Sequence, residues 1–231
     1  MDTKQLRMTG LGNVKQNWGL SIGVALIVFL LAGWGVSFLP ELDFTFPAEL
    51  EEHFDWMREW NFRVDSFTVS FKPFASLGLV QLIIGGVIEM GYCIFLLKQH
   101  DGREPEFRDV FSMFDYFGTG FAQRFLRNLY VTLWSLLLVI PGIIASYSYA
   151  MTPYILAENP GLRANEAISR SKEMMDGYKG ELFLLHLTFI GWDLLAVLTL
   201  NIGHLWLNPY KHAAEAAFYR QLQAKQQTYI A

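Results

Sequence analysis

Hydrophobic residues along this chain gather in long blocks, and the arrangement recurs three times. Each block turns back on itself and then gives way to a short charged segment, and the blocks cover residues 18–97, 121–156 and 182–219. They contain apolar stretches of roughly 17 to 24 residues, and a helix needs about 20 to cross a bilayer core about 30 Å thick. The pattern therefore predicts a polytopic membrane protein built from helices.

The second block leaves two interpretations open. Residues 129–156 are almost unbroken and would form a single helix about 42 Å long, which is too long for an untilted span. Pro141 and Gly142 lie in the middle, and proline inside a helix removes a hydrogen bond and clashes with the preceding turn. The stretch is therefore either one kinked, tilted helix or a tight hairpin.

Positive charge favours the hairpin. Segments 98–128 and 158–181, on either side of this block, both carry several Lys and Arg residues, which is typical of cytoplasmic segments. Only a hairpin places both segments on the same side. Arg124 and Arg127 are then expected to extend from the start of the third span towards the lipid headgroups.

The same reasoning places a turn at 199–203. We predict a single all-α integral membrane domain over 1–231, with about six transmembrane spans in three hairpins and both termini cytoplasmic. The expected spans are 18–39, 74–97, 121–140, 142–157, 181–199 and 203–222. The first is expected to be a retained span rather than a signal peptide, because its apolar run is long. Segment 40–73 is expected outside, and its role is left open.

Composition supports this class. Only 17% of the residues are charged, against about 25% in soluble domains. The outside segment is acidic, with eight Asp or Glu and three Lys or Arg between 41 and 72. The single cysteine, Cys93, lies within an apolar block, so no disulfide framework is expected.

Two amphipathic helices are predicted along the inner membrane surface. One begins at Pro105, and its aromatic and aliphatic residues recur at helical spacing with Asp109 facing away. The residues expected on its apolar face are Phe107, Val110, Phe111, Phe114 and Phe117. The other covers 163–175 and is expected to stop at Gly177.

Ionisable residues inside the predicted spans are the candidate site. A charge at the bilayer centre costs at least about 2.5–3.5 kcal/mol, so such groups usually face a partner or a cavity. The candidates are Glu89, His186, Asp193, Lys211, His212 and Glu215, with His204 near them in sequence. Folding back at 200–202 would bring Asp193 close to Lys211 and His186 close to Glu215.

Three interpretations of this polar seam remain open. It is a structural ion pair, a path for substrate or protons, or a metal site formed by His186, Asp193, His212 and Glu215. A metal is not expected, because Lys211 is available to the carboxylates. Glu89 has no evident partner in the sequence and is expected to be protonated; it is the leading single candidate for a buried functional acid.

No motif of a soluble enzyme is present. The chain lacks a phosphate-binding glycine loop, paired metal-binding cysteines, a His-Glu-x-x-His helix and a nucleophile elbow. We expect a non-enzymatic protein without cofactor or nucleic-acid partner, which binds lipids or other membrane proteins, or forms a homo-oligomer, in envelope homeostasis. The alternative is a small transporter or channel-like protein; a membrane-embedded enzyme is the weaker one.

Several segments resemble a known family. Segments 17–20, 134–143, 151–160, 169–175 and 181–183 include an Ile-Pro-Gly-Ile and an Asn-Pro motif. Together they resemble a bacterial integral-membrane family of unknown function, number nine-seventy-five, over nearly the whole chain. That family is distantly similar to the membrane domain of some glycerophosphodiester phosphodiesterases. The resemblance implies residence in the bacterial cytoplasmic (inner) membrane and a link to lipids, and it supplies no catalytic residues.

Overall fold

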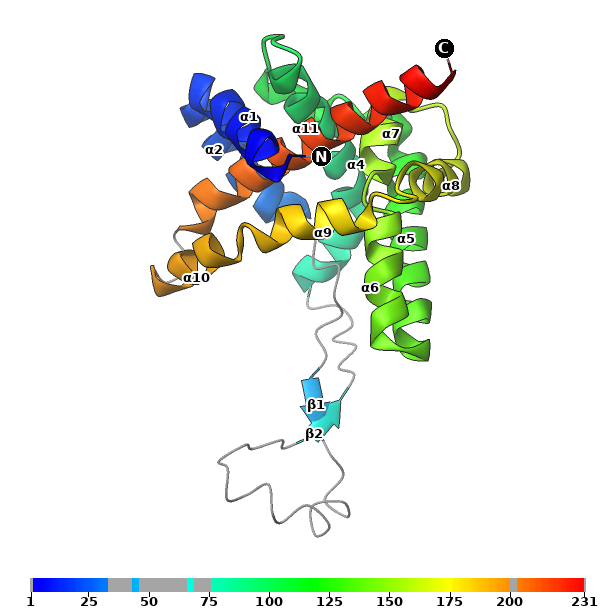
Figure 1. Ribbon diagram of the computed structural model, residues 1–231. Helices are drawn as coiled ribbons and strands as arrows, with labels where there is room; N and C mark the ends of the chain where they lie inside the picture. The colour runs from blue at the N-terminus through cyan, green and yellow to red at the C-terminus, as the bar shows by residue number, and fades with distance from the viewer. Residues whose placement is uncertain (1, 33–42, 46–65, 69–75, 200–202, 231) are drawn as a thin grey trace.

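The computed structural model describes residues 2–32, 43–45, 66–68, 76–199 and 203–230, and these residues are almost entirely helical (Figure 1). The α-helices are α1 (Thr3–Gln16), α2 (Trp18–Ala32), α4 (Ser76–His100), α5 (Phe117–Leu137), α6 (Val139–Ser148), α7 (Thr152–Glu158), α8 (Ala164–Met174), α9 (Lys179–Leu187), α10 (Ile190–Leu198) and α11 (His204–Ile230). Two 3-10 turns, η2 (Phe107–Phe111) and η3 (Phe114–Tyr116), precede α5. Strands β1 (Asp43–Thr45) and β2 (Ser66–Thr68) pair antiparallel, with Asp43 opposite Thr68. The predicted helical class is confirmed for this part of the chain.

Helix α4 lies at the centre of the packing and contacts α2, α5, α7, α11 and η2. Its buried residues include Val87, Ile88, Met90 and Phe95. Glycines on α4 permit very close backbone approach: a methyl group on Gly86 would overlap the carbonyl oxygen of Gly120, and one on Gly91 would overlap that of Val110. The glycines therefore fix how closely α5 and η2 can lie against α4.

The predicted hairpin in the second block is present as α5 and α6, with a different turn. The chain reverses at Leu138, which has extended backbone angles, three residues before Pro141. Pro141 lies in the first turn of α6, where a missing N–H removes no helical hydrogen bond. Gly142 lies directly against Ser135 across the hairpin. The prediction that Pro141 and Gly142 form the reversal was wrong, because proline is better accommodated at a helix start.

The predicted fourth and fifth spans are not continuous helices. Segment 142–157 is divided between α6 and α7 at Tyr149–Met151, and segment 181–199 is divided at Thr188–Phe189. Within the described residues, one helical segment, Gln81–His100, is long and apolar enough to cross a membrane by length and composition. Trp18–Phe29 is a shorter apolar segment. Six transmembrane spans are therefore not confirmed.

Parts of the first span and of the outside segment cannot be compared. Helix α2 is described to Ala32, and residues 33–39 lie outside the described residues. The same holds for most of 40–73, where only β1 and β2 are described. The turn predicted within 199–203 also falls largely on residues 200–202, which lie outside the described part.

The two predicted amphipathic helices had different outcomes. The one at 163–175 is α8, with Ala164, Ala167 and Ile168 buried, and the chain leaves it through Gly177 at φ +76°. The one beginning at Pro105 is not an α-helix: Phe107–Phe111 and Phe114–Tyr116 form 3-10 turns, and Asp109 is buried instead of facing away. The physical reason is Asp109, which is buried and whose carboxylate accepts hydrogen bonds from Lys98 (2.6 Å) and from the backbone of Glu106 (2.8 Å).

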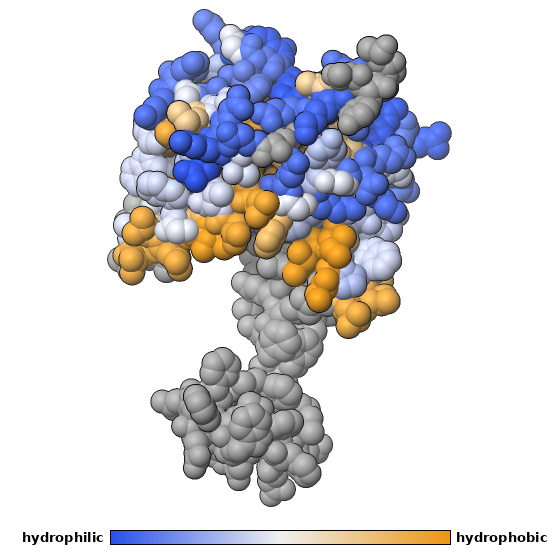
Figure 2. All heavy atoms as spheres, in the orientation of Figure 1, coloured by the Kyte–Doolittle hydropathy of each residue, from blue (hydrophilic) through white to orange (hydrophobic). Residues whose placement is uncertain are grey.

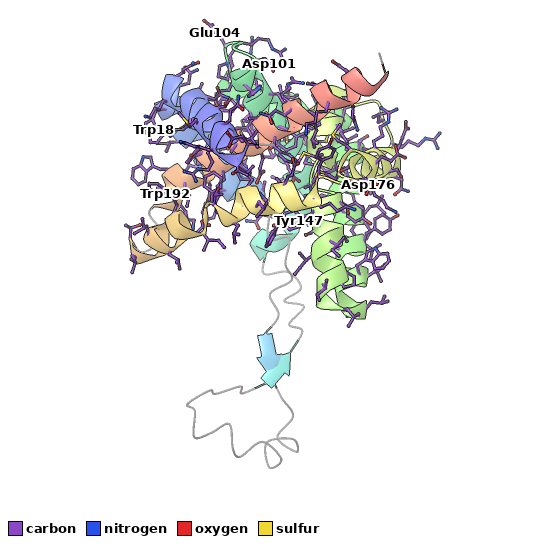
Figure 3. The ribbon with its side chains drawn as sticks, in the orientation of Figure 1. Trp18, Asp101, Glu104, Tyr147, Asp176 and Trp192 are labelled. Carbon is purple, nitrogen blue, oxygen red and sulfur yellow. The ribbon has the colours of Figure 1, made fainter. Side chains whose placement is uncertain are left out.

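Exposed apolar side chains gather on one side of the body. Figure 2 shows them in orange along its lower edge, whereas the opposite side is mostly hydrophilic and carries the C-terminus and the loop with Asp101 and Glu104 (Figures 1 and 3). Their main contributors are the α5–α6 hairpin and α10. The exposed residues are Leu133, Trp134, Leu136, Leu137, Leu138, Ile140, Ile144, Ile190, Trp192, Leu194, Leu195 and Leu198.

Candidate functional site

Helices α10 and α11 bring the first predicted pair together. The Lys211 ammonium donates to both carboxylate oxygens of Asp193, at 2.6 and 2.7 Å. His204 also lies near this carboxylate, with its Nε2 atom 3.5 Å from Oδ1. The predicted contact between Asp193 and Lys211 is confirmed, since a chain that folds back near residue 200 places these positions at equal depth.

The second predicted pair belongs to a longer chain of hydrogen bonds. His186 Nε2 lies 2.9 Å from one oxygen of Glu215, and His212 Nδ1 lies 3.2 Å from the other. The Tyr147 hydroxyl, on α6, lies 3.3 Å from His186 Nδ1 (Figure 3). These four residues, Tyr147, His186, Glu215 and His212, are called the relay cluster below.

Aromatic residues close one side of the relay cluster. The ring of Tyr92 on α4 meets His212 edge-on, with centroids 5.5 Å apart, and the Tyr154 hydroxyl donates to the His212 carbonyl at 3.5 Å. Phe183 contacts the Tyr147 ring edge-on. Imidazole side chains hydrogen-bonded to a carboxylate are among the groups that proteins most often use to transfer protons. The sequence missed Tyr147, because a tyrosine within an apolar block carries no distinguishing signal.

The four residues of the metal hypothesis divide into two groups. His186, His212 and Glu215 belong to the relay cluster, whereas Asp193 faces Lys211 and His204. Over the described ranges, no group of three or more His, Cys, Asp or Glu side chains has an arrangement that could hold a metal ion. The metal interpretation therefore gains no support.

Glu89 has partners that the sequence did not suggest. Arg127 donates to both of its oxygens, at 2.8 and 3.0 Å, and an Arg124 nitrogen lies 3.8 Å away. Gln123 approaches the carboxylate at 3.5 Å, and Arg124 also donates to the carbonyl of Ala32 at 2.8 Å. The expectation that Glu89 has no partner was wrong.

The position of the two arginines explains that error. Arg124 and Arg127 are 8% and 2% exposed, so they turn inwards to α4 instead of reaching towards headgroups. They lie three residues apart on α5, and therefore on one helix face. Two arginines three residues apart in one predicted span, with a single acidic residue in the preceding span, could have indicated this pairing from the sequence. Glu89 is thus part of the interface between α4 and α5.

A second charged network lies at the end of α4. Arg220 of α11 donates to both oxygens of Asp101, at 2.6 and 2.9 Å, and also pairs with Glu158 at the end of α7. Arg103 donates to Asp101 at 2.6 Å. Burial raises the pKa of Asp101, but the hydrogen bonds from Arg220 and Arg103 outweigh it and hold this pKa below its ordinary value.

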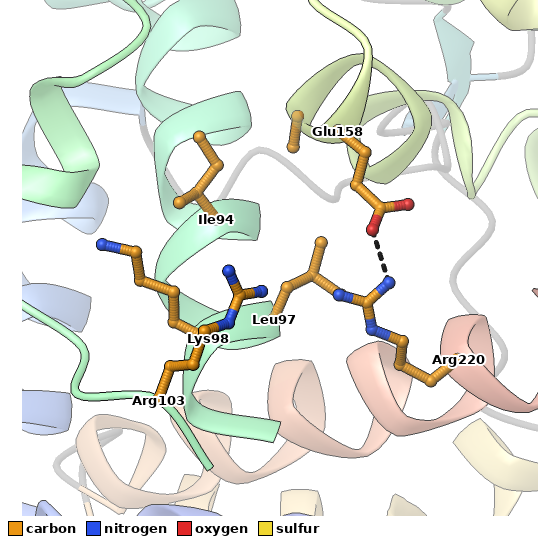
Figure 4. A pocket seen from close by; sticks show the side chains of 7 residues that line it. Ile94, Leu97, Lys98, Arg103, Glu158 and Arg220 are labelled. Atoms are coloured by element: carbon orange, nitrogen blue, oxygen red, sulfur yellow. Dashed lines mark hydrogen bonds and ion pairs between the residues drawn. The ribbon is translucent and has the colours of Figure 1, made fainter. Parts of the chain in front are cut away.

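This network borders a pocket of about 280 Å³ (Figure 4). Its lining combines three basic side chains, one carboxylate and an apolar wall. The lining residues are Ile94, Leu97, Lys98, Arg103, Ala157, Glu158 and Arg220. Sequence reasoning missed the pocket, since its residues come from four separate segments.

Comparison with known proteins gives one match. The model of a family described as "Protein of unknown function (DUF975)" matches residues 135–226, whereas no curated protein and no solved structure matches. The matched segment contains five of the six predicted site residues, and Glu89 lies outside it. The match is narrower than the expected resemblance, which extended over nearly the whole chain. The segment from the end of α5 to α11, with the relay cluster and the Asp193–Lys211 pair, is thus similar to the family DUF975.

Proposed function

We propose that this protein is a membrane-embedded binding protein whose ligands are lipids, and that it acts without catalysing a reaction. The observation that carries the proposal is the exposed apolar surface of the α5–α6 hairpin and α10. Leu137 and Ile140 are each 71% exposed and Leu198 is 79% exposed. Contiguous apolar surface of this kind marks a membrane or protein interface.

The uneven distribution of polar residues supports the proposal that lipid, and not a soluble protein partner, covers the exposed apolar surface. Apolar side chains face one side of the body, and charged loops and the C-terminus face the other (Figure 2). Each Å² of apolar surface left in water costs about 25 cal/mol. Lipid would cover all these side chains at once, whereas a single partner would have to follow both the hairpin and α10.

The location and partners follow as further parts of the proposal. We place the protein in a bacterial cytoplasmic membrane with both termini cytoplasmic, where it would serve envelope homeostasis. A second copy of the chain or another membrane protein is a further possible contact of the apolar surface. The basic segments 98–128 and 158–181 support this orientation.

A small transporter is the second candidate, and the relay cluster favours it. His186 is 27% exposed at its side chain while Glu215 is 15% exposed, so the chain of hydrogen bonds leads from an accessible imidazole inwards. Glu89 weighs against this candidate, because Arg127 neutralises the charge that a transport path would use.

Extraction from membranes tests the proposal. The protein should remain in the membrane fraction after an alkaline carbonate wash and should retain lipid when purified in mild detergent. Leu137→Asp and Ile140→Asp should weaken that retention, because each places a charge on the surface assigned to hydrocarbon. Lys172→Asp, on the exposed face of α8, is the matched control and should have no effect. Release of the unaltered protein by the wash would contradict membrane residence.

A further inference from the structure

The pocket at the end of α4 has the composition of a small-molecule site. It lies between the last turn of α4, the following loop, the end of α7 and the middle of α11. Figure 4 shows Arg103 between Lys98 and Leu97, with Glu158 and Arg220 across from them. The Arg103 side chain is 60% exposed, so a ligand can reach its guanidinium.

The charges around the pocket nearly balance. Lys98 pairs with Asp109, Arg103 and Arg220 share Asp101, and Arg220 also pairs with Glu158. The carboxylates around the pocket would repel a simple anion, and the basic side chains would repel a simple cation. Glu158 also accepts hydrogen bonds from Tyr219 and Gln223, so with Arg220 three of the roughly four acceptor positions of its carboxylate are filled and one remains. A ligand that carries both signs can use Arg103 and Lys98 at one end and this remaining position of Glu158 at the other.

The volume of the pocket and its depth in the membrane restrict the class of ligand further. Small-molecule sites usually occupy about 300–1,000 Å³, and this pocket of about 280 Å³ has room for a polar head and not for acyl chains. Lys98 lies in the last turn of the segment Gln81–His100. Under the proposed function, on which this step rests, that turn lies at headgroup depth, because a segment of 20 residues is about 30 Å long.

We propose that this pocket binds a phosphate group joined through a short linker to an ammonium group. Arg103 and Lys98 hold the phosphate oxygens, and Glu158 accepts one hydrogen bond from the ammonium. Ile94, Leu97 and Ala157 contact the linker. The chemistry is that of a phosphoethanolamine head, either on a membrane lipid or as a soluble compound.

Two experiments distinguish a phosphoethanolamine head on a membrane lipid from the free soluble compound: a competition between lipids, and binding of a soluble probe. Protein purified in detergent is offered phosphatidylethanolamine, phosphatidylcholine and phosphatidylglycerol in equal amounts, and retained lipid is measured by native mass spectrometry. Phosphatidylglycerol lacks the ammonium, and phosphatidylcholine lacks its N–H donors, so phosphatidylethanolamine should be preferred. In a second arm, phosphoethanolamine binding is measured by calorimetry.

Two variants make the test specific to the pocket. Arg103→Ala should weaken phosphoethanolamine binding, or phosphatidylethanolamine retention, about tenfold, the loss expected from one charge-assisted hydrogen bond. Arg108→Ala is the control: Arg108 is 80% exposed, pairs with Glu106 and lies outside the lining. Circular dichroism of both variants should show unchanged helicity.

The possible outcomes distinguish this inference from the proposed function. Equal retention of all three lipids, or equal binding by both variants, would overturn the pocket assignment while leaving lipid binding in place. Absence of any retained lipid would contradict the proposed function. Arg103-dependent binding of phosphoethanolamine in that case would still support the site with a soluble ligand, and no binding in either arm would overturn it.

Discussion

Glu89, Arg124 and Arg127 form a largely buried group of charges that joins helices α4 and α5. Arg127 is 2% exposed, and its bidentate contact with Glu89 links α5 to α4. Removing a charge from water is costly, and a buried ion pair recovers that cost only while both partners are present. The pair therefore fixes the position of α5 on α4 more than it adds to stability.

Glu89→Gln should lower the free energy of unfolding by about 3–5 kcal/mol, the usual effect of breaking a buried pair. The neutral amide leaves two guanidinium groups facing no carboxylate at this position. Denaturant unfolding in detergent, followed by circular dichroism, measures the change. Glu166→Gln is the control, since its pair with Arg170 is about half exposed and is worth about 0.3–0.5 kcal/mol. Equal losses for both variants would contradict the buried-pair interpretation.

Asp101 gives a pH-dependent contribution of predictable sign. Its pKa in the folded protein lies below the ordinary value, so the folded state favours the carboxylate. That stabilisation is fully present above the unfolded pKa of about 3.9 and is lost as pH falls through the folded pKa. The difference in Tm between the unaltered protein and Asp101→Asn should be constant from about pH 5 to 7 and shrink below about pH 4. A difference that persists at the acid end would show that Asp101 acts by packing alone.

At the scale of elements, two helix pairings could be predicted from the sequence. One followed from the positive charge on both sides of an apolar block, and the other from residues that lie at the same depth when the chain folds back. The basic segments on either side of the second block predicted the α5–α6 hairpin, and the fold-back near residue 200 predicted the Asp193–Lys211 contact. Both predictions need only that the chain reverses within a given stretch, and so the hairpin is present although its turn lies at Leu138 and not at Pro141.

The errors have a common physical cause in tertiary contacts that no local pattern reveals. Residues 107–117 have helical spacing of apolar side chains, but the buried carboxylate of Asp109 accepts hydrogen bonds from Lys98 and from the backbone of Glu106 and so holds the first 3-10 turn. Glu89 had no evident partner because Arg127 is 38 residues away in sequence. The pocket depends on α7 and α11 meeting α4, which the sequence does not specify.

A substitution at Gly91 tests how closely η2 is packed on α4. A methyl group at Gly91 would overlap the backbone carbonyl of Val110, and backbone cannot rotate away as a side chain can. Gly91→Ala should therefore destabilise the protein by about 1–3 kcal/mol, the range for an overpacked core. Gly23→Ala on α2 is the matched control, because nothing lies within 4 Å of its position. It should be neutral or stabilise by up to about 1 kcal/mol, so similar losses at both sites would contradict close packing at Gly91.

At the scale of the whole molecule, the proposed membrane residence determines which segments lie on the same side of the membrane. Helix α4 ends at His100, and the charged network of Asp101, Glu158 and Arg220 lies just beyond it. Helix α8 begins a few residues after Glu158, so it should lie on the same side as the loop after α4. Strands β1 and β2 precede α4 and should lie on the opposite side.

Single-cysteine labelling decides the arrangement. Cys93 is 3% exposed and can be replaced by alanine, after which a cysteine is introduced at Glu104, Lys172, Gln226 or Thr68. A membrane-impermeant maleimide should label Thr68→Cys in intact bacterial cells, because a crossing by α4 puts this residue outside. Glu104→Cys, Lys172→Cys and Gln226→Cys should react only after the membrane is permeabilised. Labelling of Lys172→Cys from outside would mean that α5 and α6 do not return the chain to the side where α4 ends, and the hairpin would then have to be a crossing.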